Sequence, residues 1–444
     1  MNIYGEDEMS KKIGIVKEKK NAWERRVPLI PSDVQRLIAA QDVEIIVQPS
    51  NQRIFPDVEF ENAGAILKDD LSACDLIFGI KEVKIGDLIR GKTYLYFSHT
   101  IKGQPYNMPM LKKILDLKCT LLDYERMVDE KNQRLIYFSY HAGVAGTIDS
   151  FWAYGQRLVR EQISSPFMNI NQTFRYQDQA AAESAFADLG KQINKNGLPG
   201  SIRPLVIGIT GYGNVSRGVQ HMLSFLPLEK IKPDDLTDFH RRHASIDDRI
   251  VQVIFREEDM FKRLETEQPF NLQEYYRNPE KYRADFERYL PELDILINAS
   301  FWDSAYPRHV TKDALRRLFT SGQRPRLRVI GDISCDVQGG IECTVRVTDP
   351  GNPVYVYQPS TDSIRDGVAG EGPVIMAVDN LPSELPKDAS LYFSSVLKTI
   401  VPDLLAVDWR VSFDDLRLPE ALKKAVIVHQ GRLTDDYRYL ADYL

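Results

Sequence analysis

The 444-residue sequence has few cysteines and no long apolar run, and these absences exclude several classes of protein. The four cysteines are Cys74, Cys119, Cys335 and Cys343. They contain no CxxC pair, so we expect reduced thiols rather than a disulfide framework. No apolar stretch reaches the roughly 18 residues of a membrane-spanning helix. Acidic residues precede Lys11 where a signal peptide would be basic and then apolar, so we expect a soluble, cytoplasmic protein.

Positive charge is not in excess either. The chain has 57 Lys and Arg against 63 Asp and Glu, a net charge of -6, which argues against a nucleic-acid partner that depends on bulk positive charge. The seven histidines show no metal-ligand spacing, so we expect no metal site. Because the chain has neither a long apolar run nor an excess of positive charge, we expect no membrane or nucleic-acid partner. With 43% hydrophobic and 27% charged residues, the composition is that of a globular protein of two or three domains.

Short apolar runs alternate with helical or loop stretches in the first third of the chain. The runs lie at 11–17, 43–47, 75–80, 93–97 and 119–123, and they predict a mostly parallel sheet. The last three are followed by Lys81 and Glu82, by His99, and by Glu125. Because ligands of open α/β sheets bind at the carboxyl ends of strands, these side chains are candidate catalytic residues. The alternative for each is an ordinary charged residue where a strand meets solvent.

A glycine-rich turn lies in the middle of the chain. Leu205–Thr210 reads as a strand, Gly211-Tyr-Gly213 as a turn, and the residues that follow as an amphipathic helix. This order predicts a dinucleotide site in which a pyrophosphate lies at the helix N-terminus; a purely structural turn is the alternative. The expected cofactor-binding residues are Gly211, Gly213, Asn214, Val215 and Ser216. Ser216 stands where the third glycine of G-x-G-x-x-G is usual, and Gly218 follows two residues later.

The residue that usually reads the adenosine ribose is not obvious. The segment 228–233 offers Glu229 but also Lys230 and Lys232, and the lysines favour a 2′-phosphate, hence NADP, with NAD or a solvated turn as alternatives. Later apolar runs at 293–299 and 327–330 predict further strands of this second sheet. Asp332 follows the second run and is expected to face the same cleft, unless it caps a turn. A charged, tyrosine-rich segment near 230–290 reads as an insertion.

Several motifs resemble one enzyme family. They are Asn21-Ala-Trp-Glu-Arg-Arg-Val-Pro-Leu29, Phe97-Ser-His-Thr-Ile-Lys102, Ala142-Gly-Val-Ala-Gly146, Gly211-Tyr-Gly-Asn-Val-Ser216, Asp332-Ile-Ser334 and Val378-Asp-Asn-Leu-Pro382. Together they resemble lysine–ketoglutarate reductase, the saccharopine-forming part of aminoadipic semialdehyde synthase, within the group of alanine dehydrogenase, transhydrogenase and saccharopine dehydrogenase. The resemblance runs from about Lys11 to Val401; the last forty or so residues match less clearly.

The resemblance implies an α/β fold of two Rossmann-like domains with parallel sheets and an active-site cleft between them. A discontinuous substrate domain would comprise 1–145 and 375–444, and a nucleotide-binding domain 146–374. By the same resemblance, Lys81 and His99 are catalytic, Glu82 and Glu125 support them, Arg26 and Arg25 bind a substrate carboxylate, and Asp332 lies near substrate and nicotinamide.

The implied reaction condenses the ε-amine of lysine with 2-oxoglutarate and reduces the imine with NADPH to saccharopine, or runs in reverse. A related dehydrogenase with another amino acid and 2-oxo acid, or a non-catalytic nucleotide sensor on the same fold, are the alternatives. Histidine titrates nearest neutrality, so His99 is the natural acid–base residue, and Lys81 is either a second acid or base or an electrostatic clamp. Homo-oligomers occur among relatives, so we allow for one here.

Overall fold

The computed structural model describes residues 11–236, 239, 250–265, 268–322 and 325–444, and it divides the chain into two compact units. Unit 1 comprises 1–137 and 386–444, and unit 2 comprises 138–385. The divisions expected from the family resemblance lie at 145/146 and 374/375. The motif 142–146 lies within a helix of unit 2, where Val144 and Ala145 are completely buried.

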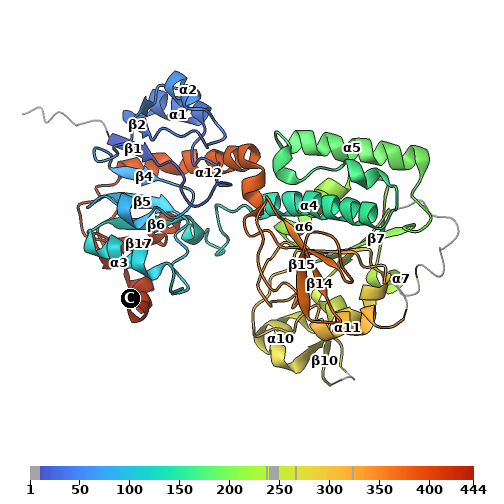
Figure 1. Cartoon of the computed structure of the whole chain (residues 1–444). Helices are drawn as coiled ribbons and strands as arrows, with labels where there is room; N and C mark the ends of the chain where they lie inside the picture. The colour runs from blue at the N-terminus through green and yellow to red at the C-terminus, as the bar shows by residue number, and fades with distance from the viewer. Residues whose placement is uncertain (1–10, 237–238, 240–249, 266–267, 323–324) are drawn as a thin grey trace, which may run out of the picture. The chain divides into compact units, whose positions relative to one another are not determined.

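Unit 1 contains one large sheet. Its strands are β1 (Lys11–Ile15), β2 (Val43–Val47), β3 (Ile66–Leu67), β4 (Leu76–Phe78), β5 (Thr93–Tyr96), β6 (Thr120–Asp123), β17 (Val426–His429) and β18 (Arg432–Leu433). They lie in the order β18-β17-β6-β5-β4-β1-β2-β3 (Figure 1). The six strands from the N-terminal segment are parallel, whereas β17 and β18 are antiparallel. The last forty or so residues, which match the family motifs less clearly, therefore include two strands that extend this sheet beyond β6.

Five helices and three 3₁₀ turns are described in unit 1. They are α1 (Pro31–Ala40), α2 (Asp57–Asn62), α3 (Met108–Asp116), α12 (Pro386–Ala406) and α13 (Glu420–Lys423), with 3₁₀ turns η1 (Ile85–Asp87), η2 (Tyr124–Arg126) and η8 (Asp435–Tyr443). Helix α12 contacts the N-terminal segment through hydrogen bonds and an ion pair. Ser390 accepts from the amide of Val27, Ser394 accepts from that of Ile30, and Lys398 pairs with Asp33 at 2.9 Å. These bonds explain why a segment so late in the chain belongs to unit 1.

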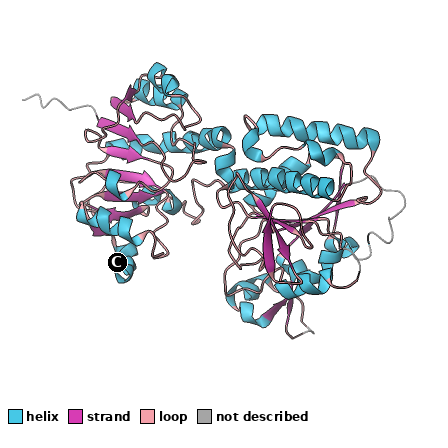
Figure 2. Ribbon diagram, viewed as in Figure 1, coloured by secondary structure: helices cyan, strands magenta, loops and turns pink. Residues whose placement is uncertain are grey.

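Unit 2 contains a second sheet and a small hairpin. Its strands are β7 (Leu205–Thr210), β8 (Leu228–Ile231), β9 (Ile250–Phe255), β10 (Phe261–Arg263), β11 (Tyr282–Ala284), β12 (Ile295–Asn298), β13 (Val329–Asp332), β14 (Val354–Gln358), β15 (Ser363–Asp366) and β16 (Val374–Met376). The main order is β15-β14-β16-β13-β12-β7-β9-β8, parallel from β8 to β16, and β10 pairs with β11. Figure 2 shows the strands of both units in magenta and the helices in cyan. Both units thus have a largely parallel sheet with antiparallel strands added at one end.

Helices of unit 2 cover both faces of its sheet. They are α4 (Ser139–Arg160), α5 (Gln179–Asn196), α6 (Asn214–Leu223), α7 (Pro233–Leu236), α9 (Glu257–Met260), α10 (Leu272–Arg277) and α11 (Lys312–Phe319), with 3₁₀ turns η3 (Pro166–Asn169), η4 (Thr173–Arg175), η5 (Pro279–Lys281), η6 (Phe286–Glu292) and η7 (Leu381–Glu384). Leu205, Ile207 and Ile209 of β7 join the core that contains α4, α5 and α6. Val206 belongs to the core on the other face, as the period of two in a strand requires.

The charged segment near 230–290 is not one continuous insertion. It includes β9, which lies beside β7 in the sheet, whereas β8, earlier in the chain, is the edge strand. The additional elements α9, β10, α10 and β11 follow β9. Residues 237–238, 240–249 and 266–267 of this segment lie outside the described part. Among the described residues, no helix combines the length and apolarity that a membrane span needs.

Candidate functional site

The carboxyl ends of β4 and β5 bring two predicted catalytic residues into contact. Nδ1 of His99 lies 2.8 Å from Oε1 of Glu82, and both side chains belong to loops that follow neighbouring strands. The backbone at His99 is left-handed, with φ of 50°, which is uncommon for a residue with a side chain. Nδ2 of Asn107 donates to the carbonyl of His99 at 3.0 Å and fixes this turn.

Glu82 is ionised in this arrangement. Its side chain is 8% exposed, and burial opposes ionisation, but the hydrogen bond and charge of His99 outweigh burial, so the pKa of Glu82 falls to about 2. Lys20 lies 3.2 Å from the same carboxylate. A carboxylate that holds an imidazole in one orientation, and stabilises its protonated form, is a suitable partner for an acid–base histidine.

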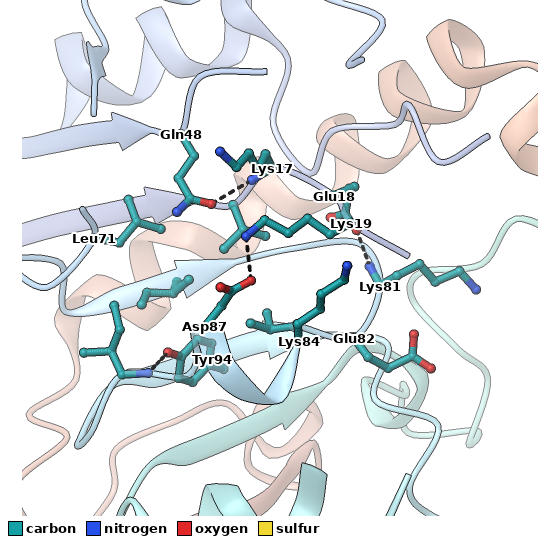
Figure 3. Close-up of a pocket in the computed structure, with 14 residues that line it drawn as sticks. Lys17, Glu18, Lys19, Gln48, Leu71, Lys81, Glu82, Lys84, Asp87 and Tyr94 are labelled. Carbon is teal, nitrogen blue, oxygen red and sulfur yellow. Dashed lines mark hydrogen bonds and ion pairs between the residues drawn. The ribbon is translucent and has the colours of Figure 1, made fainter. Parts of the chain in front are cut away.

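Glu18 is a further acidic group that sequence analysis missed. Its two carboxylate oxygens accept from the amides of Ile80, at 2.6 Å, and Lys81, at 3.1 Å, so Glu18 fixes the start of the loop that presents Lys81 (Figure 3). Burial, together with the nearby charge of Glu24, raises the pKa of Glu18 to about 8. The signal available in the sequence was its place directly after the predicted run 11–17.

The pocket that these residues line is small. Its volume is about 30 Å³, the space of one or two water molecules. Figure 3 shows the side chain of Lys81 running away from the centre of this pocket, and the carboxylate of Glu82 also pointing away. The side chains of Lys81 and Glu82 thus point out of this pocket.

Asp123 positions two of the loops that carry predicted site residues. It is completely buried at the end of β6, where it accepts from the amide of Ser98 at 3.0 Å and from that of Glu125 at 2.8 Å. Burial raises the pKa of Asp123 to about 6. Glu125 itself forms an ion pair with Arg134, and the structure gives it no contact with His99.

Arg26 is held by a neighbour rather than exposed. The side chain is 1% exposed, and its Nε and Nη2 donate to the two oxygens of Glu24 at 2.7 and 2.5 Å. Arg25 is half-buried and donates to the carbonyl of Gln52 at 3.2 Å. A paired guanidinium of this kind is fixed in place, and its contact with a substrate carboxylate stays a prediction.

The glycine turn of unit 2 has the shape of a phosphate cradle. Gly211, between β7 and α6, has φ of 85°, a conformation that favours glycine. At Gly213, which precedes α6, a Cβ would meet no atom within 4 Å, so the space above the turn is open. Gly213 also has no side chain with which to cap the helix, so the first amides of α6 remain available to an anion. These residues fit a dinucleotide pyrophosphate.

The close packing under this cradle comes from glycines other than the one expected. A Cβ at Gly218 would lie 2.2 Å from the carbonyl oxygen of Tyr140, and a Cβ at Gly143 would lie 2.0 Å from that of Val215. Helices α4 and α6 therefore touch backbone to backbone. Ser216 is completely buried and accepts from Gln220 at 3.2 Å, so its small side chain is tolerated where the third glycine is usual.

A cavity of about 560 Å³ extends from the glycine turn along the carboxyl ends of β7, β9, β12 and β13. Gly211 to Val215, Glu257, Ser300 and His309 line it, together with the aromatic residues Tyr212, Phe261, Tyr275, Tyr276, Phe301 and Tyr306. Burial lowers the pKa of His309 to about 4, so this imidazole is neutral at physiological pH. The cavity has the size and the apolar lining typical of a cofactor site.

Asp332 lies at the end of β13 as predicted, but it is 1% exposed. Oδ1 accepts from Asn298 at 2.9 Å and from the amide of Cys335 at 3.2 Å, and Oδ2 accepts from Thr344 at 2.6 Å. Burial raises its pKa to about 6. The bond to Cys335, three residues on, is that of a turn cap. The carboxylate expected to face a cleft is thus enclosed in unit 2, and its contact with substrate or cofactor stays a prediction.

The strand that should carry the ribose-reading residue is β9, not β8. The expectation that Glu229, Lys230 or Lys232 would stand there is wrong, because β8 is the edge strand and β9 pairs with β7. The residue directly after β9 is Arg256, whose guanidinium lies 5.0 Å from the ring centre of Tyr212. The apolar run Ile250-Val-Gln-Val-Ile-Phe255 could have predicted this strand. The run lies within the charged segment 230–290, which was interpreted as an insertion.

The described residues contain no cluster of His, Cys, Asp or Glu suited to a metal ion. All four cysteines are free thiols; Cys335 is partly buried and the other three are buried.

Family models match both parts of the chain. The N-terminal domain model of alanine dehydrogenase/PNT matches residues 14–145, and the C-terminal domain model of the same family matches residues 241–436.

Curated relatives align over most of the chain. Alpha-aminoadipic semialdehyde synthase of Arabidopsis thaliana is 36% identical over 99% of this chain and 42% of its own length, and the mitochondrial protein of that name from Bos taurus is 33% identical over 96% and 47%. The chain thus spans about half the length of these relatives. Saccharopine dehydrogenase [NAD(+), L-lysine-forming] of Neurospora crassa is 28% identical over 88% of this chain and 90% of its own length.

Solved structures show the same architecture. An L-alanine dehydrogenase superposes with a TM-score of 0.62 at 17% identity, covering 98% of this chain and all of that one. A transhydrogenase from Sinorhizobium meliloti gives 0.55 at 15% identity over 96% of this chain and all of that one. The predicted fold, two α/β domains with largely parallel sheets, is confirmed, and the two family models together account for most of the sequence. The chain therefore belongs to the alanine dehydrogenase/PNT family.

Proposed function

We propose that this protein catalyses the NAD(P)H-dependent reductive condensation of L-lysine with 2-oxoglutarate to saccharopine, or the reverse reaction. The observation that carries the proposal is the His99–Glu82 pair at the strand ends of unit 1, in a chain whose unit 2 has an open glycine cradle. Relatives named for saccharopine and aminoadipic semialdehyde chemistry, aligned over almost the whole chain, support the choice of substrates.

The chemistry needs proton transfer at several atoms. The ε-amine of lysine must be neutral to attack the carbonyl carbon, the carbinolamine hydroxyl must leave as water, and the imine nitrogen must carry a proton at reduction. In the proposal, His99 moves these protons while Glu82 keeps its ring oriented. Lys81 begins the same loop and contributes a positive charge or a second acid–base group. Both roles for Lys81, the electrostatic clamp and the second acid or base, are kept in this proposal.

The nucleotide is assigned to unit 2. Gly211, Gly213 and the first amides of α6 would hold the pyrophosphate, and the reduced nicotinamide supplies a hydride to the imine carbon. NADP is the proposed cofactor, with NAD as the alternative, because a basic rather than an acidic residue follows β9. Arg26 is proposed to bind a substrate carboxylate, since the pairing with Glu24 leaves its planar guanidinium in a fixed orientation.

Free thiols support a reducing compartment. We propose the cytoplasm; the relatives from cattle, rat and mouse carry mitochondrial names, and localisation of the tagged full chain decides between these compartments.

The test is oxidation of NADPH, followed by absorbance, with defined pairs of substrates. We expect consumption with lysine plus 2-oxoglutarate, and none when glutamate replaces lysine or pyruvate replaces 2-oxoglutarate. Consumption with another pair would indicate a related dehydrogenase, and binding of nucleotide without turnover of any pair would indicate a sensor. Saccharopine is identified in the mixture by mass spectrometry.

The role of His99 has its own test. His99→Ala should lower kcat about a hundredfold or more, the usual worth of a positioned acid–base group, while the Kd for NADPH stays unchanged because His99 belongs to unit 1. Lys102→Ala, an exposed change in the same loop, is the matched control. Near-normal turnover in His99→Ala would refute the assignment.

A further inference from the structure

The residues around the end of β9 form a site on one side of the glycine turn. Strand β9 pairs with β7 in register, with Phe255 opposite Thr210, so Arg256 comes opposite Gly211. The amide of Gly211 donates to the carbonyl of Phe255 at 2.9 Å and ties the two strand ends together. Arg256 is exposed, and its guanidinium lies over the ring of Tyr212 at 5.0 Å. The charge is thereby placed beside the residue between the two cradle glycines.

This placement matters because of how a dinucleotide crosses such a sheet. With its pyrophosphate at the turn between β7 and α6, its adenosine ribose lies over the end of the neighbouring strand, which is β9 here. A carboxylate at that point accepts from the 2′-hydroxyl of NAD, whereas arginine offers a planar set of donors to the 2′-phosphate of NADP. Tyr212 is 42% exposed, so the Arg256–Tyr212 pair is open to a ligand.

An acidic residue next to Arg256 would work against a phosphate, and the structure shows how it is restrained. Glu257 lines the cavity, but its Oε1 accepts from the hydroxyl of Tyr276 at 2.8 Å. Burial and this contact with Glu257 raise the pKa of Tyr276, so the hydroxyl keeps its proton and donates it. Tyr276 belongs to α10, one of the elements added after β9. The added segment therefore supplies the residue that occupies the carboxylate of Glu257, and Asp259 accepts from the amide of Arg256 at 2.8 Å.

We propose that Arg256, stacked on Tyr212, binds the 2′-phosphate of NADPH and selects it over NADH, and that Tyr276 positions Glu257 away from that phosphate. This inference rests on the proposed function for its dinucleotide, and it adds the residues that determine cofactor specificity. Arg256 is the contacting residue, and Tyr276 acts through Glu257.

The test separates binding from turnover. Full-length protein is titrated calorimetrically with adenosine 2′,5′-bisphosphate and with adenosine 5′-monophosphate, which differ only in the 2′-phosphate, and then with NADPH and NADH. We expect the wild type to bind the bisphosphate at least about tenfold more tightly, the lower end of what a charge-assisted hydrogen bond contributes. Arg256→Ala should reduce this ratio to about threefold or less, with monophosphate affinity unchanged. That unchanged affinity also shows that the variant is folded.

Two further variants sharpen the result. Arg277→Ala removes an exposed arginine from α10 and should leave the ratio as in the wild type. Tyr276→Phe frees Glu257 and should weaken NADPH while strengthening NADH, a change in opposite directions that simple damage to the site would not produce.

Equal affinity of the wild type for the two adenosine phosphates, or an undiminished ratio in Arg256→Ala, would overturn the inference. If the proposed function is wrong, no saccharopine forms with either nucleotide. The ratios of affinity for the two adenosine phosphates would then still be as expected. Saccharopine formation with NADH and NADPH at equal efficiency would overturn the inference alone.

Discussion

Glu18 should make the stability of unit 1 depend on pH in a way that one substitution abolishes. The carboxyl has a pKa of about 8, raised from 4.5 by burial and by Glu24. A carboxyl whose pKa is higher in the folded protein than in the unfolded chain stabilises the fold fully below 4.5, and this stabilisation is lost as pH rises through 8. Between pH 6 and pH 8 the loss amounts to about 2 kcal/mol, at ~1.4 kcal/mol for each pH unit before titration levels off.

Glu18→Gln removes this dependence. The amide oxygen of glutamine can accept only one of the two bonds that Glu18 accepts from Ile80 and Lys81, which costs about 1 kcal/mol at every pH. The wild type has lost about 2 kcal/mol by pH 6, so the variant should be less stable than the wild type only below about pH 5, and more stable at pH 6 and above. The two stability curves cross, and this crossing distinguishes a titrating carboxyl from a purely structural hydrogen-bond acceptor.

The assay is hydrogen exchange of peptides that cover residues 76–84, measured by mass spectrometry from pH 4.5 to pH 8.5 and corrected for intrinsic exchange rates. These peptides contain the two amides that Glu18 binds. Glu61→Gln, a change at an exposed glutamate of unit 1, is the control and should retain the wild-type slope. Parallel pH dependences for wild type and Glu18→Gln would refute the reasoning, because another group would then be responsible.

Two glycine substitutions should separate the binding role of the cradle from its packing. Gly213→Ala should leave the Tm unchanged, since a Cβ there meets no atom within 4 Å and φ is -78°. The same change should weaken the binding of NADPH, measured by titration calorimetry, at least about tenfold. Wild-type affinity for NADPH would argue against a pyrophosphate at this turn. Gly143→Ala places a Cβ 2.0 Å from the carbonyl oxygen of Val215, so α4 and α6 must separate, at about 1–3 kcal/mol for an overpacked contact. Scanning calorimetry should show the loss in the transition of unit 2, and an unchanged transition would contradict the backbone contact.

Local patterns in the sequence predicted much of this fold. Runs of buried residues such as Ile13 and Ile15 predict strands wherever they occur, because a strand covered on both faces needs apolar residues at successive positions. The turn from Gly211 to Gly213 predicts a phosphate cradle because the conformation that it needs is available to glycine alone at low cost. The resemblance of several motifs to a known family likewise depends only on the order of residues, and the two family models agree with it.

The tertiary structure decided which strands are neighbours in each sheet. Sequence order places 228–231 before 250–255, but pairing in the sheet puts β9 next to β7, and with it Arg256 rather than Lys230 beside the glycine turn. A strand's neighbours depend on the packing of both its faces, which no local pattern records. The addition of β17 to the edge of this sheet could not be predicted for the same reason, since β17 pairs with β6 across some three hundred positions.

Burial and pairing of charged groups were decided in the same way. The sequence alone gave Asp332, Glu125 and Arg26 as charged residues near strand ends; the fold encloses Asp332, pairs Glu125 with Arg134 and locks Arg26 to Glu24. By itself the sequence determined the strands, the glycine turn and the family, because each depends on residues close together in the chain. Whether a carboxyl is solvated, paired or enclosed depends on groups far away in the chain, whose charges and bulk act through space, and only the folded protein brings those groups together.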